Sequence, residues 1–298
     1  MLIESFLIYL QHEKRYSPHT ITSYQTDLLQ FVDFLKKDFE INPDQAKATH
    51  IRSFMVFLLD SQIAENAVGR KISTLRSFYK YLLREGDLKT NPMALIKAPK
   101  VPKRLPVFIE DAKMDLLLDG GVEGKLIFDE SFASQRDKIV LELLFGTGIR
   151  LAELLAIKET DINYYEGTIK VLGKRNKERI VPLHAQLEVQ LKIYINLKLT
   201  QQFNNKNTTL IVTNTGAPAY PKLVYRIVNS YLTLISTQDK KSPHVLRHSF
   251  ASSLLNKGAD LNAIKELLGH ASLAATQVYT HNSVERLKSI YKQAHPKA

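Results

Sequence analysis

The chain has 298 residues, 44% of them hydrophobic, and a formal net charge of +11 with a sequence pI near 9.5. This length suffices for one large domain or two ordinary ones, each with its own core. The absence of cysteine excludes disulfides, thiolate nucleophiles and cysteine-based zinc fingers, and it fits a reducing cytoplasm, where we expect the protein to act. No apolar run approaches the ~20 residues of a membrane span, and the first residues do not resemble a signal peptide, so no membrane partner is expected.

Positive charge is spread over both halves of the chain. Lysine and arginine outnumber the acids by 16 to 11 up to residue 105 and by 25 to 19 after it. This excess predicts an anionic partner. Charge alone does not choose among DNA, RNA, anionic lipid and plain solubility.

Residues 1–97 are predicted to form a helical bundle. Ser17, followed by a proline, is typical of a cap that opens a helix. Thr49 is expected to cap a second helix, and Asn66 to begin a third that Gly86 ends. Apolar residues recur at helical spacing along all three segments, which predicts the core of the bundle.

The polar face of the third helix is cationic. Its positive residues are Arg70, Lys71, Arg76, Lys80 and Arg84. A solvated face usually mixes both signs, so this face predicts contact with a DNA backbone, although a merely solvated face stays the alternative.

Residues 98–106 are predicted to be a linker between two domains. Their three prolines cannot continue a helix and keep the segment extended. Lys103 and Arg104 make it cationic, so both are candidates for DNA-backbone contact as well.

Residues 107–298 are predicted to form a second domain of α+β type, so the chain is mainly α with a small antiparallel β-sheet. Strands are expected at Thr168–Leu172 and Arg179–Pro182, around the turn LGKRNKE, with a third short strand at Leu210–Thr213. Helices are expected near 109–119, 134–147, 150–158, 184–200, 220–235, 244–257, 260–268, 272–280 and 283–293.

Arg150 lies in GTGIRLAEL, where a glycine turn can direct its side chain from the start of a new helix. The alternative is a surface arginine paired with Glu153 at i+3. The motif is not a dinucleotide fingerprint, because Leu151 stands where the third glycine is needed. Gly124 and Lys125 do not make a phosphate loop, so ATP chemistry has no support.

Lys174 lies in the predicted hairpin turn beside Arg175, itself a candidate for DNA-backbone contact. The alternative is a solvated hairpin tip. A lysine there could protonate a leaving oxygen, because its proton is transferable whereas that of arginine is not.

His244 and Arg247 lie one helical turn apart, with Ser242 as the expected cap. His248 at i+4 from His244 invites a zinc interpretation. We reject it because no glutamate follows His244 and because Arg247 would place a positive charge beside the metal. Neither a metal nor a cofactor is expected.

His270 follows Gly269 in LLGH, and Tyr279 lies in TQVYTH. The ordinary alternatives are a helix-capping histidine and a packed tyrosine. Taken with Arg150, Lys174 and the HVLRH pair, however, these residues supply what metal-free cleavage of a phosphodiester requires. Guanidiniums neutralise the phosphate, a cation protonates the leaving oxygen and a phenol attacks.

The segments HVLRHSFAS and LLGHASLAATQVYTH, together with the spacing from Arg150 to Lys174, resemble the catalytic domain of tyrosine recombinases, the phage integrase family, and above all its Xer subgroup. The resemblance covers essentially the whole chain and implies a SAM-like, core-binding helical domain before an α+β catalytic domain. Two departures occur. Arg175 stands where the family hairpin commonly has glycine, and Ala152 replaces a frequent serine.

The resemblance implies a role for each motif residue. Arg150 and Arg247 would bind the nonbridging phosphate oxygens, and His270 would donate a further hydrogen bond. Tyr279 would attack to form a 3′-phosphotyrosyl link and free a 5′-hydroxyl.

The proton transfers follow from the same resemblance. Lys174 would act as general acid toward the 5′-oxygen, and His244 would assist proton movement at the nucleophile.

The partners implied are double-stranded DNA and three further subunits, because strand exchange between two duplexes needs a tetramer of this protein or of this protein with a related recombinase. The setting implied is chromosome-dimer resolution or integration and excision of a mobile element. The helix near 283–293 would dock on a neighbouring protomer; the alternative is packing on its own domain. A type IB topoisomerase and a DNA-binding protein that no longer cuts are the competing functions.

Overall fold

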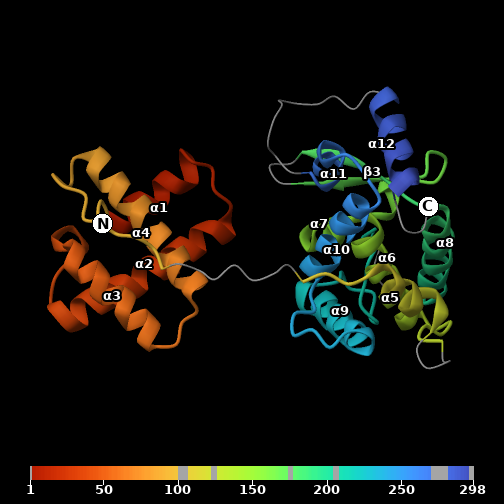
Figure 1. Ribbon diagram of the computed structural model, residues 1–298, viewed down its shortest axis with the longest axis horizontal. Helices are drawn as coiled ribbons and strands as arrows, with labels where there is room; N and C mark the ends of the chain where they lie inside the picture. The colour runs from red at the N-terminus through yellow and green to blue at the C-terminus, as the bar shows by residue number, and fades with distance from the viewer. Residues whose placement is uncertain are drawn as a thin grey trace. The chain divides into compact units, whose positions relative to one another are not determined.

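The computed structural model describes residues 2–99, 107–121, 126–173, 177–203, 208–269 and 281–294, with side chains in the last segment from residue 288 onward. The chain divides into two compact units, Met1–Arg104 and Leu105–Ala298 (Figure 1). Most of the predicted linker 98–106 lies outside the described residues, so its extent stays a prediction. In the described part of the chain, no helix has the length and apolar character needed to cross a membrane.

The first unit is helical, as predicted. Its buried core contains apolar side chains from the segments with helical spacing, such as Phe31, Phe54 and Phe78. Phe6 joins them from a further helix at the start of the chain. The elements are α1 (Leu2–His12), α2 (Pro18–Phe39), η1 (Pro43–Gln45), α3 (Ala48–Asp60) and α4 (Glu65–Glu85).

Two of the predicted helix signals are confirmed. The Ser17 side chain accepts a hydrogen bond from the backbone N–H of Thr20 at the start of α2, and Gly86 ends α4 with φ 86°. The starts of the other two helices are corrections. Helix α3 begins before Thr49, because His50 Nδ1 already accepts the N–H of Lys47 at 3.1 Å. Helix α4 begins at Glu65, so Asn66 lies inside its first turn.

The second unit combines a small sheet with several helices. Strands β1 (Ile162–Asn163), β2 (Thr168–Leu172) and β3 (Glu178–Pro182) pair antiparallel in the order β1-β2-β3. The helical elements are α5 (Asp111–Asp115), η2 (Leu116–Gly120), α6 (Phe132–Thr147), α7 (Leu151–Ala156), η3 (Glu159–Asp161), α8 (Ala185–Thr200), α9 (Pro221–Ile235), α10 (Pro243–Asn256), α11 (Leu261–Leu268) and α12 (His281–Ala294). The predicted helix 272–280 lies outside the described residues.

The third strand was predicted in the wrong place. Leu210–Thr213 forms only an isolated bridge, between Val212 and Pro218, and β1 completes the sheet instead. Leu210, Ile211 and Val212 are fully buried, which explains the strand-like apolar run. Their backbone partners belong to separate segments, because the N–H of Leu210 donates to Ile157 O at 2.8 Å and the N–H of Ala219 donates to Ile211 O at 3.0 Å. A ladder with one neighbouring strand therefore does not form.

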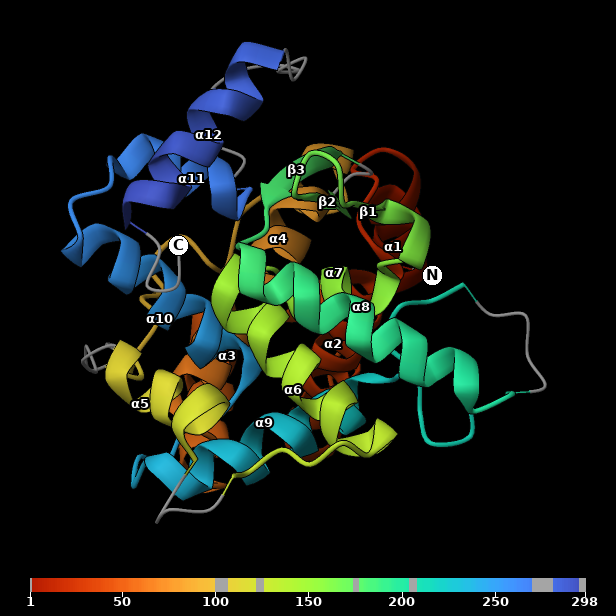
Figure 2. The same ribbon diagram turned by 90° about the vertical axis from the view of Figure 1, so that its right-hand side faces the viewer.

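Helix α6 occupies the middle of this unit. It lies beside α8 (Figure 2), and it also contacts α9 and α10. Its residues from Ile139 to Thr147 are buried on every side, which is the pattern of a helix enclosed by its neighbours. Because α6 ends inside the core at Gly148, its surroundings fix the position of the residues that follow.

The C-terminal helix α12 packs on its own unit in this structure. Tyr291 and Ala294 are 2% and 1% exposed, and the Tyr291 hydroxyl donates to Gly146 O at 2.7 Å. Packing on its own unit is the alternative to docking on a neighbouring protomer. Docking on a neighbouring protomer stays a prediction about the assembled protein.

Candidate active site

Half of the predicted catalytic residues can be placed. Arg150, His244 and Arg247 belong to the described part of the chain. The residues outside it are Lys174, His270 and Tyr279 among the catalytic candidates, and Lys103, Arg104 and Arg175 among the DNA-contact candidates.

Arg150 is the residue that opens α7. Gly148 ends α6 with φ 61°, and a Cβ added there would lie 2.3 Å from Phe250 Cδ1, so this glycine serves both the turn and the close approach. The N–H of Arg150 donates to Glu153 Oε2 at 2.7 Å, and Nη1 of Arg150 donates to Glu153 Oε1 at 2.8 Å. The pairing with Glu153 that was weighed as an ordinary alternative therefore exists, and it fixes a guanidinium that is 35% exposed.

Arg247 lies deeper, on α10. It is 8% exposed, and its Nη1 donates to Gly148 O while its Nη2 donates to Leu268 O at 2.6 Å. Burial, followed by the positive charge of Arg150, lowers the pKa of Arg247 to about 10. The side chain thus stays a cation at neutral pH although a second cation lies close to it.

A third arginine, Arg179 on β3, belongs to the same cluster and was not among the predicted residues. It is 5% exposed. Its Nη1 and Nη2 donate to the two carboxylate oxygens of Glu153 at 2.9 and 2.8 Å, and its Nε donates to Leu267 O at 3.0 Å. A sequence signal was available, because Arg179 shares its strand face with Val181, and an arginine on an inward face needs a carboxylate partner.

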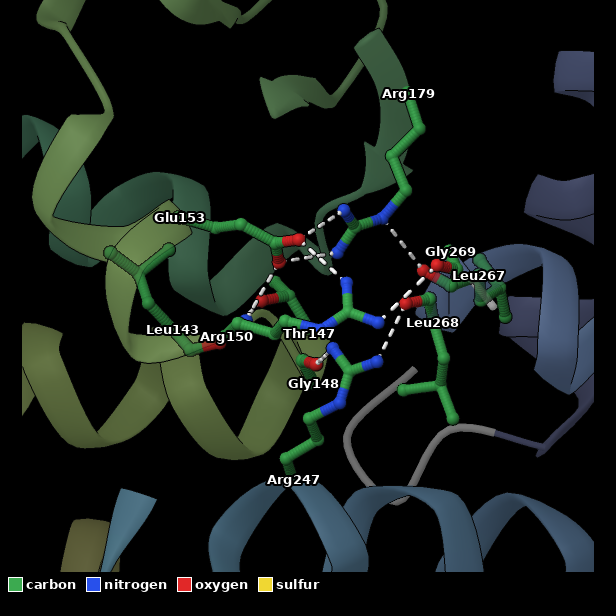
Figure 3. A network of polar contacts seen from close by, with 10 residues as sticks. All are labelled: Leu143, Thr147, Gly148, Arg150, Glu153, Arg179, Arg247, Leu267, Leu268 and Gly269. Atoms are coloured by element: carbon green, nitrogen blue, oxygen red, sulfur yellow. Dashed lines mark hydrogen bonds and ion pairs between the residues drawn. The ribbon is translucent and has the colours of Figure 1, made fainter. Parts of the chain in front are cut away.

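The end of α11 is where the three arginines meet (Figure 3). The carbonyl oxygens of three consecutive residues, Leu267, Leu268 and Gly269, each accept from a different guanidinium. Their donors, in that order, are Arg179 at 3.0 Å, Arg247 at 2.6 Å and Arg150 at 3.3 Å. The last carbonyls of a helix lack partners within it and carry partial negative charge, so guanidiniums suit them. Gly269 ends the helix with φ 64°, as predicted, one residue before His270.

Glu153 is the carboxylate that these arginines share. Burial by itself raises its pKa, but the hydrogen bonds and charge of Arg179, and then the hydrogen bonds from Arg150, lower it to about 2. Glu153 is therefore ionised at neutral pH. The described contacts set three guanidinium charges against one carboxylate, so the cluster has an excess of positive charge suited to an anion.

His244 is exposed on α10, one turn before Arg247. Ser242 is the residue before the helix, as predicted, but its side chain makes no capping hydrogen bond. His248 is exposed too. Among the residues that the structure describes, no group of three His, Asp or Glu side chains is placed to hold a metal ion.

In the first unit, one of the DNA-contact candidates is corrected by the structure. Lys71 is 8% exposed, and its Nζ lies 2.9 Å from Oδ1 of Asp27, which is itself 1% exposed. Thr74 Oγ1 donates to Asp27 Oδ2 at 2.9 Å, and Nη1 of Arg70 contacts the same carboxylate. Lys71 thus faces the core, where it neutralises a buried charge, and it does not lie on the exposed face of α4.

The other candidates on α4 do reach the surface. The Arg70 side chain is 50% exposed, and its Nη1 also donates to Ser23 Oγ at 2.7 Å. Arg76 and Lys80 are exposed, and Nη2 of Arg76 donates to Ile96 O at 3.1 Å. These three residues give α4 an exposed cationic face, and its contact with DNA stays a prediction.

Comparison with known proteins places the chain in a family. Residues 125–286 match the model of the phage integrase family, and residues 3–86 match the model described as phage integrase, N-terminal SAM-like domain. A tyrosine recombinase XerC of Listeria innocua serovar 6a is 38% identical over 299 residues, covering 100% of this chain and 98% of the relative. A tyrosine recombinase XerC of Chlorobaculum parvum is 37% identical over 319 residues, covering 99% of this chain and 94% of the relative.

Solved structures support the fold. A XerH site-specific recombinase bound to palindromic difH substrate, in a post-cleavage complex, matches with a TM-score of 0.72 at 23% identity, covering 96% of this chain and 82% of the other. A lambda integrase in a tetramer bound to a Holliday junction matches with a TM-score of 0.68 at 19% identity, covering 92% of this chain and 74% of the other. With both family models matched and relatives at this identity over almost their full length, the chain belongs to the phage integrase family of tyrosine recombinases and is of Xer type.

Proposed function

We propose that the protein is a site-specific DNA recombinase that cuts and rejoins DNA through a 3′-phosphotyrosyl intermediate, in the manner of its Xer relatives. The observation that carries the proposal is the excess of guanidinium charge around Glu153. Arg150 and Arg247 converge on the end of α11, and Arg150 shares the carboxylate of Glu153 with Arg179. A phosphodiester that gains negative charge on attack is the anion that such a pair suits.

Each catalytic residue has a place in this chemistry. Arg150 and Arg247 bind the nonbridging oxygens, and His270 donates a further hydrogen bond to the same phosphate. Tyr279 attacks phosphorus, so that one P–O bond forms while the bond to the 5′-oxygen breaks. These roles follow the family pattern.

Two proton transfers complete the step. The phenol has an ordinary pKa of ~10, so Tyr279 must lose its proton as it attacks, and His244 assists that transfer. Lys174 delivers a proton to the 5′-oxygen, which leaves as a hydroxyl. The balance needs no water, metal or nucleotide, because one phosphate ester replaces another. A different 5′-hydroxyl can then attack the phosphotyrosine and restore the DNA backbone.

The partner is double-stranded DNA, and the active assembly is a tetramer of this protein or of this protein with a related recombinase. The first unit contributes the cationic face of α4, where Arg70, Arg76 and Lys80 contact the DNA backbone. Chromosome-dimer resolution in the cytoplasm and integration or excision of a mobile element use the same chemistry, and both fit this site.

A nicked suicide substrate tests the proposal. Its cut strand releases a short fragment, so the covalent intermediate accumulates. We expect a DNA adduct that survives denaturation in the wild type and is absent in Tyr279→Phe. Failure of the wild type to form any adduct on a substrate that it binds would overturn the proposal in favour of a DNA-binding protein that does not cut.

A second experiment separates recombination from strand relaxation. Two duplexes carrying the target site should yield recombinant products. Relaxation of supercoils without recombinant products would instead indicate a type IB topoisomerase. The match to XerC relatives over almost their whole length supports the first outcome.

A further inference from the structure

We infer that Arg179 is a positioning residue of this active site, which holds Arg150 and the end of α11 in one fixed arrangement through Glu153 and the Leu267 carbonyl. The inference rests on the proposed function, since it names what keeps the phosphate-binding arginines in place.

The guanidinium of Arg179 binds groups of the protein itself, so a positioning role needs no direct contact of this residue with DNA. All three of its guanidinium nitrogens donate to protein acceptors, at 2.8 to 3.0 Å. The side chain is 5% exposed. Arg150, in contrast, is 35% exposed at the side chain. Arg179 therefore acts through its neighbours, whereas Arg150 is open to a ligand.

Glu153 transmits the position of Arg179 to Arg150. Its Oε1 accepts from Nη1 of both arginines, at 2.9 Å from Arg179 and 2.8 Å from Arg150. Its Oε2 accepts from Arg179 Nη2 at 2.8 Å and from the backbone N–H of Arg150 at 2.7 Å. Both the backbone and the guanidinium of Arg150 thus bind a carboxylate whose orientation the planar fork of Arg179 fixes (Figure 3).

Two glycines show how closely the neighbouring segments approach this side chain. A Cβ added at Gly269 would lie 3.2 Å from Arg179 Cδ, and one added at Gly173 would lie 3.6 Å from Arg179 Nη1. Gly173 directly precedes Lys174, and Gly269 directly precedes His270. The residues directly before Lys174 and His270 therefore both lie against Arg179. Glu153, which binds Arg150, contacts the same side chain.

The test compares variants by single-turnover cleavage at saturating DNA, so that differences in binding do not enter the rate. Removing Arg179 alone would leave Glu153 buried with Arg150 as its one remaining arginine partner among the described contacts, and the loss of this buried ion pair lowers the stability of the domain. The informative variant is therefore Arg179→Met/Glu153→Gln, which removes both charges. We expect its thermal stability to return toward that of the wild type while cleavage stays roughly 10- to 100-fold slower, as for a misplaced catalytic group. Cleavage within about twofold of the wild type would overturn the inference.

A conservative variant tests the geometry. Arg179→Lys keeps the charge but offers one nitrogen in place of a three-nitrogen fork. We expect it to cleave slowly as well. Full activity in this variant would show that only charge is needed, and it would overturn the role of the fork.

Arg136 supplies a matched control in the same unit. It is also 5% exposed and is bound to Asp137 and Asn214. Arg136→Met is expected to lower stability and to leave the cleavage rate of the bound complex within about twofold. If Arg136→Met loses as much cleavage activity as the Arg179 variants, the loss in those variants reflects reduced stability of the domain, and the positioning role is overturned.

A modified substrate shows which catalytic residue Arg179 serves. A sulfur in place of the bridging 5′-oxygen leaves as a thiolate, whose conjugate acid has a pKa of ~8.5, so this substrate does not need the general acid. If Arg179 acts through Arg150, the sulfur substrate does not restore cleavage in Arg179→Met/Glu153→Gln. Restoration would place the defect at the general acid and overturn the route through Arg150. Adduct formation by the wild type tests the proposed function separately, so the two ideas can fail independently.

Discussion

Both units of the protein bury a carboxylate among cations, and the two clusters serve different ends. In the first unit, Asp27 on α2 accepts hydrogen bonds from three side chains of the adjacent helix α4, those of Arg70, Lys71 and Thr74. The carboxylate joins two helices and leaves one cation, Arg70, half-exposed. In the second unit, Glu153 forms ion pairs with Arg150 at the start of α7 and with Arg179 on β3. A further arginine, Arg247 on α10, donates to a carbonyl at the end of α11, where Arg150 and Arg179 also bind.

The difference between the clusters lies in where the cations come from and what else they bind. The Asp27 cluster takes both of its cations from one helix, α4, and holds that helix against α2. The Glu153 cluster draws on α7, β3 and α10, and its arginines also bind three carbonyls at the end of α11. A buried ion pair is thus not itself a sign of function. Convergence of three guanidiniums from separate elements on the end of one helix is the feature that distinguishes the site.

The largest effect is expected at the two phosphate-binding arginines. Arg150→Ala and Arg247→Ala should each slow cleavage by on the order of 10³-fold, because each removes charge stabilisation of the transition state. Only Arg247→Ala should also lower the melting temperature clearly, since Arg247 is 8% exposed and binds two buried carbonyls. Single-turnover cleavage and thermal unfolding of both variants check this. Equal stability losses in the two variants would contradict the distinction.

The Asp27 cluster should show the opposite behaviour. Asp27→Ala leaves Lys71 buried without its carboxylate, which costs about 3 kcal/mol of unfolding free energy. Asp27→Ala/Lys71→Met should recover most of this loss, because the buried charge goes as well. Chemical unfolding measures both variants, and the cleavage rate of the bound complex should remain close to that of the wild type. A double variant no more stable than the single one would show that the charge is not what matters.

The pH dependence of stability tests the Glu153 cluster by a route that does not involve DNA. The pKa of Glu153 is about 2 in the folded chain, below its ordinary value of 4.5, because the hydrogen bonds and charge of Arg179 and the hydrogen bonds from Arg150 outweigh the effect of burial. A lowered folded pKa means that this stabilisation is complete above about pH 4.5 and is lost as the pH falls toward 2. Unfolding free energy measured from pH 6 downward should therefore fall less steeply in Glu153→Gln than in the wild type. Parallel curves would contradict the assignment.

Local signals in the sequence predicted much of the fold. Ser17 opens its helix, Gly86 and Gly269 end theirs with positive φ, and the strands at 168–172 and 178–182 pair as a hairpin. Each of these follows from backbone preference or from periodicity within a few residues. The third strand was misplaced because a buried apolar run does not reveal where its backbone hydrogen bonds go.

The candidate site was predicted in part. Arg150 and Arg247 come together as the motif pattern indicated. The pairing of Arg179 with Glu153 joins residues 26 positions apart through tertiary packing, so no local spacing indicates it. The inward position of Lys71, in contrast, does have a local signal in the sequence. Lys71 lies three residues after Val68 and four before Leu75, on the buried stripe of α4, and this spacing marks it as inward-facing.

The smallest expected effect separates two lysines on the same helix. Lys80 is exposed on α4, whereas Lys71 is buried against Asp27. If the exposed face contacts the DNA backbone, Lys80→Ala should weaken binding to all sequences alike and reduce the slope of log affinity against log salt by about 1, because one phosphate contact is lost. Lys71→Met should lower stability but leave that slope unchanged, although both changes remove one positive charge. Binding isotherms at several salt concentrations decide the matter, since equal slopes for the two variants would mean that net charge alone, and not the exposed face of α4, governs the attraction to DNA.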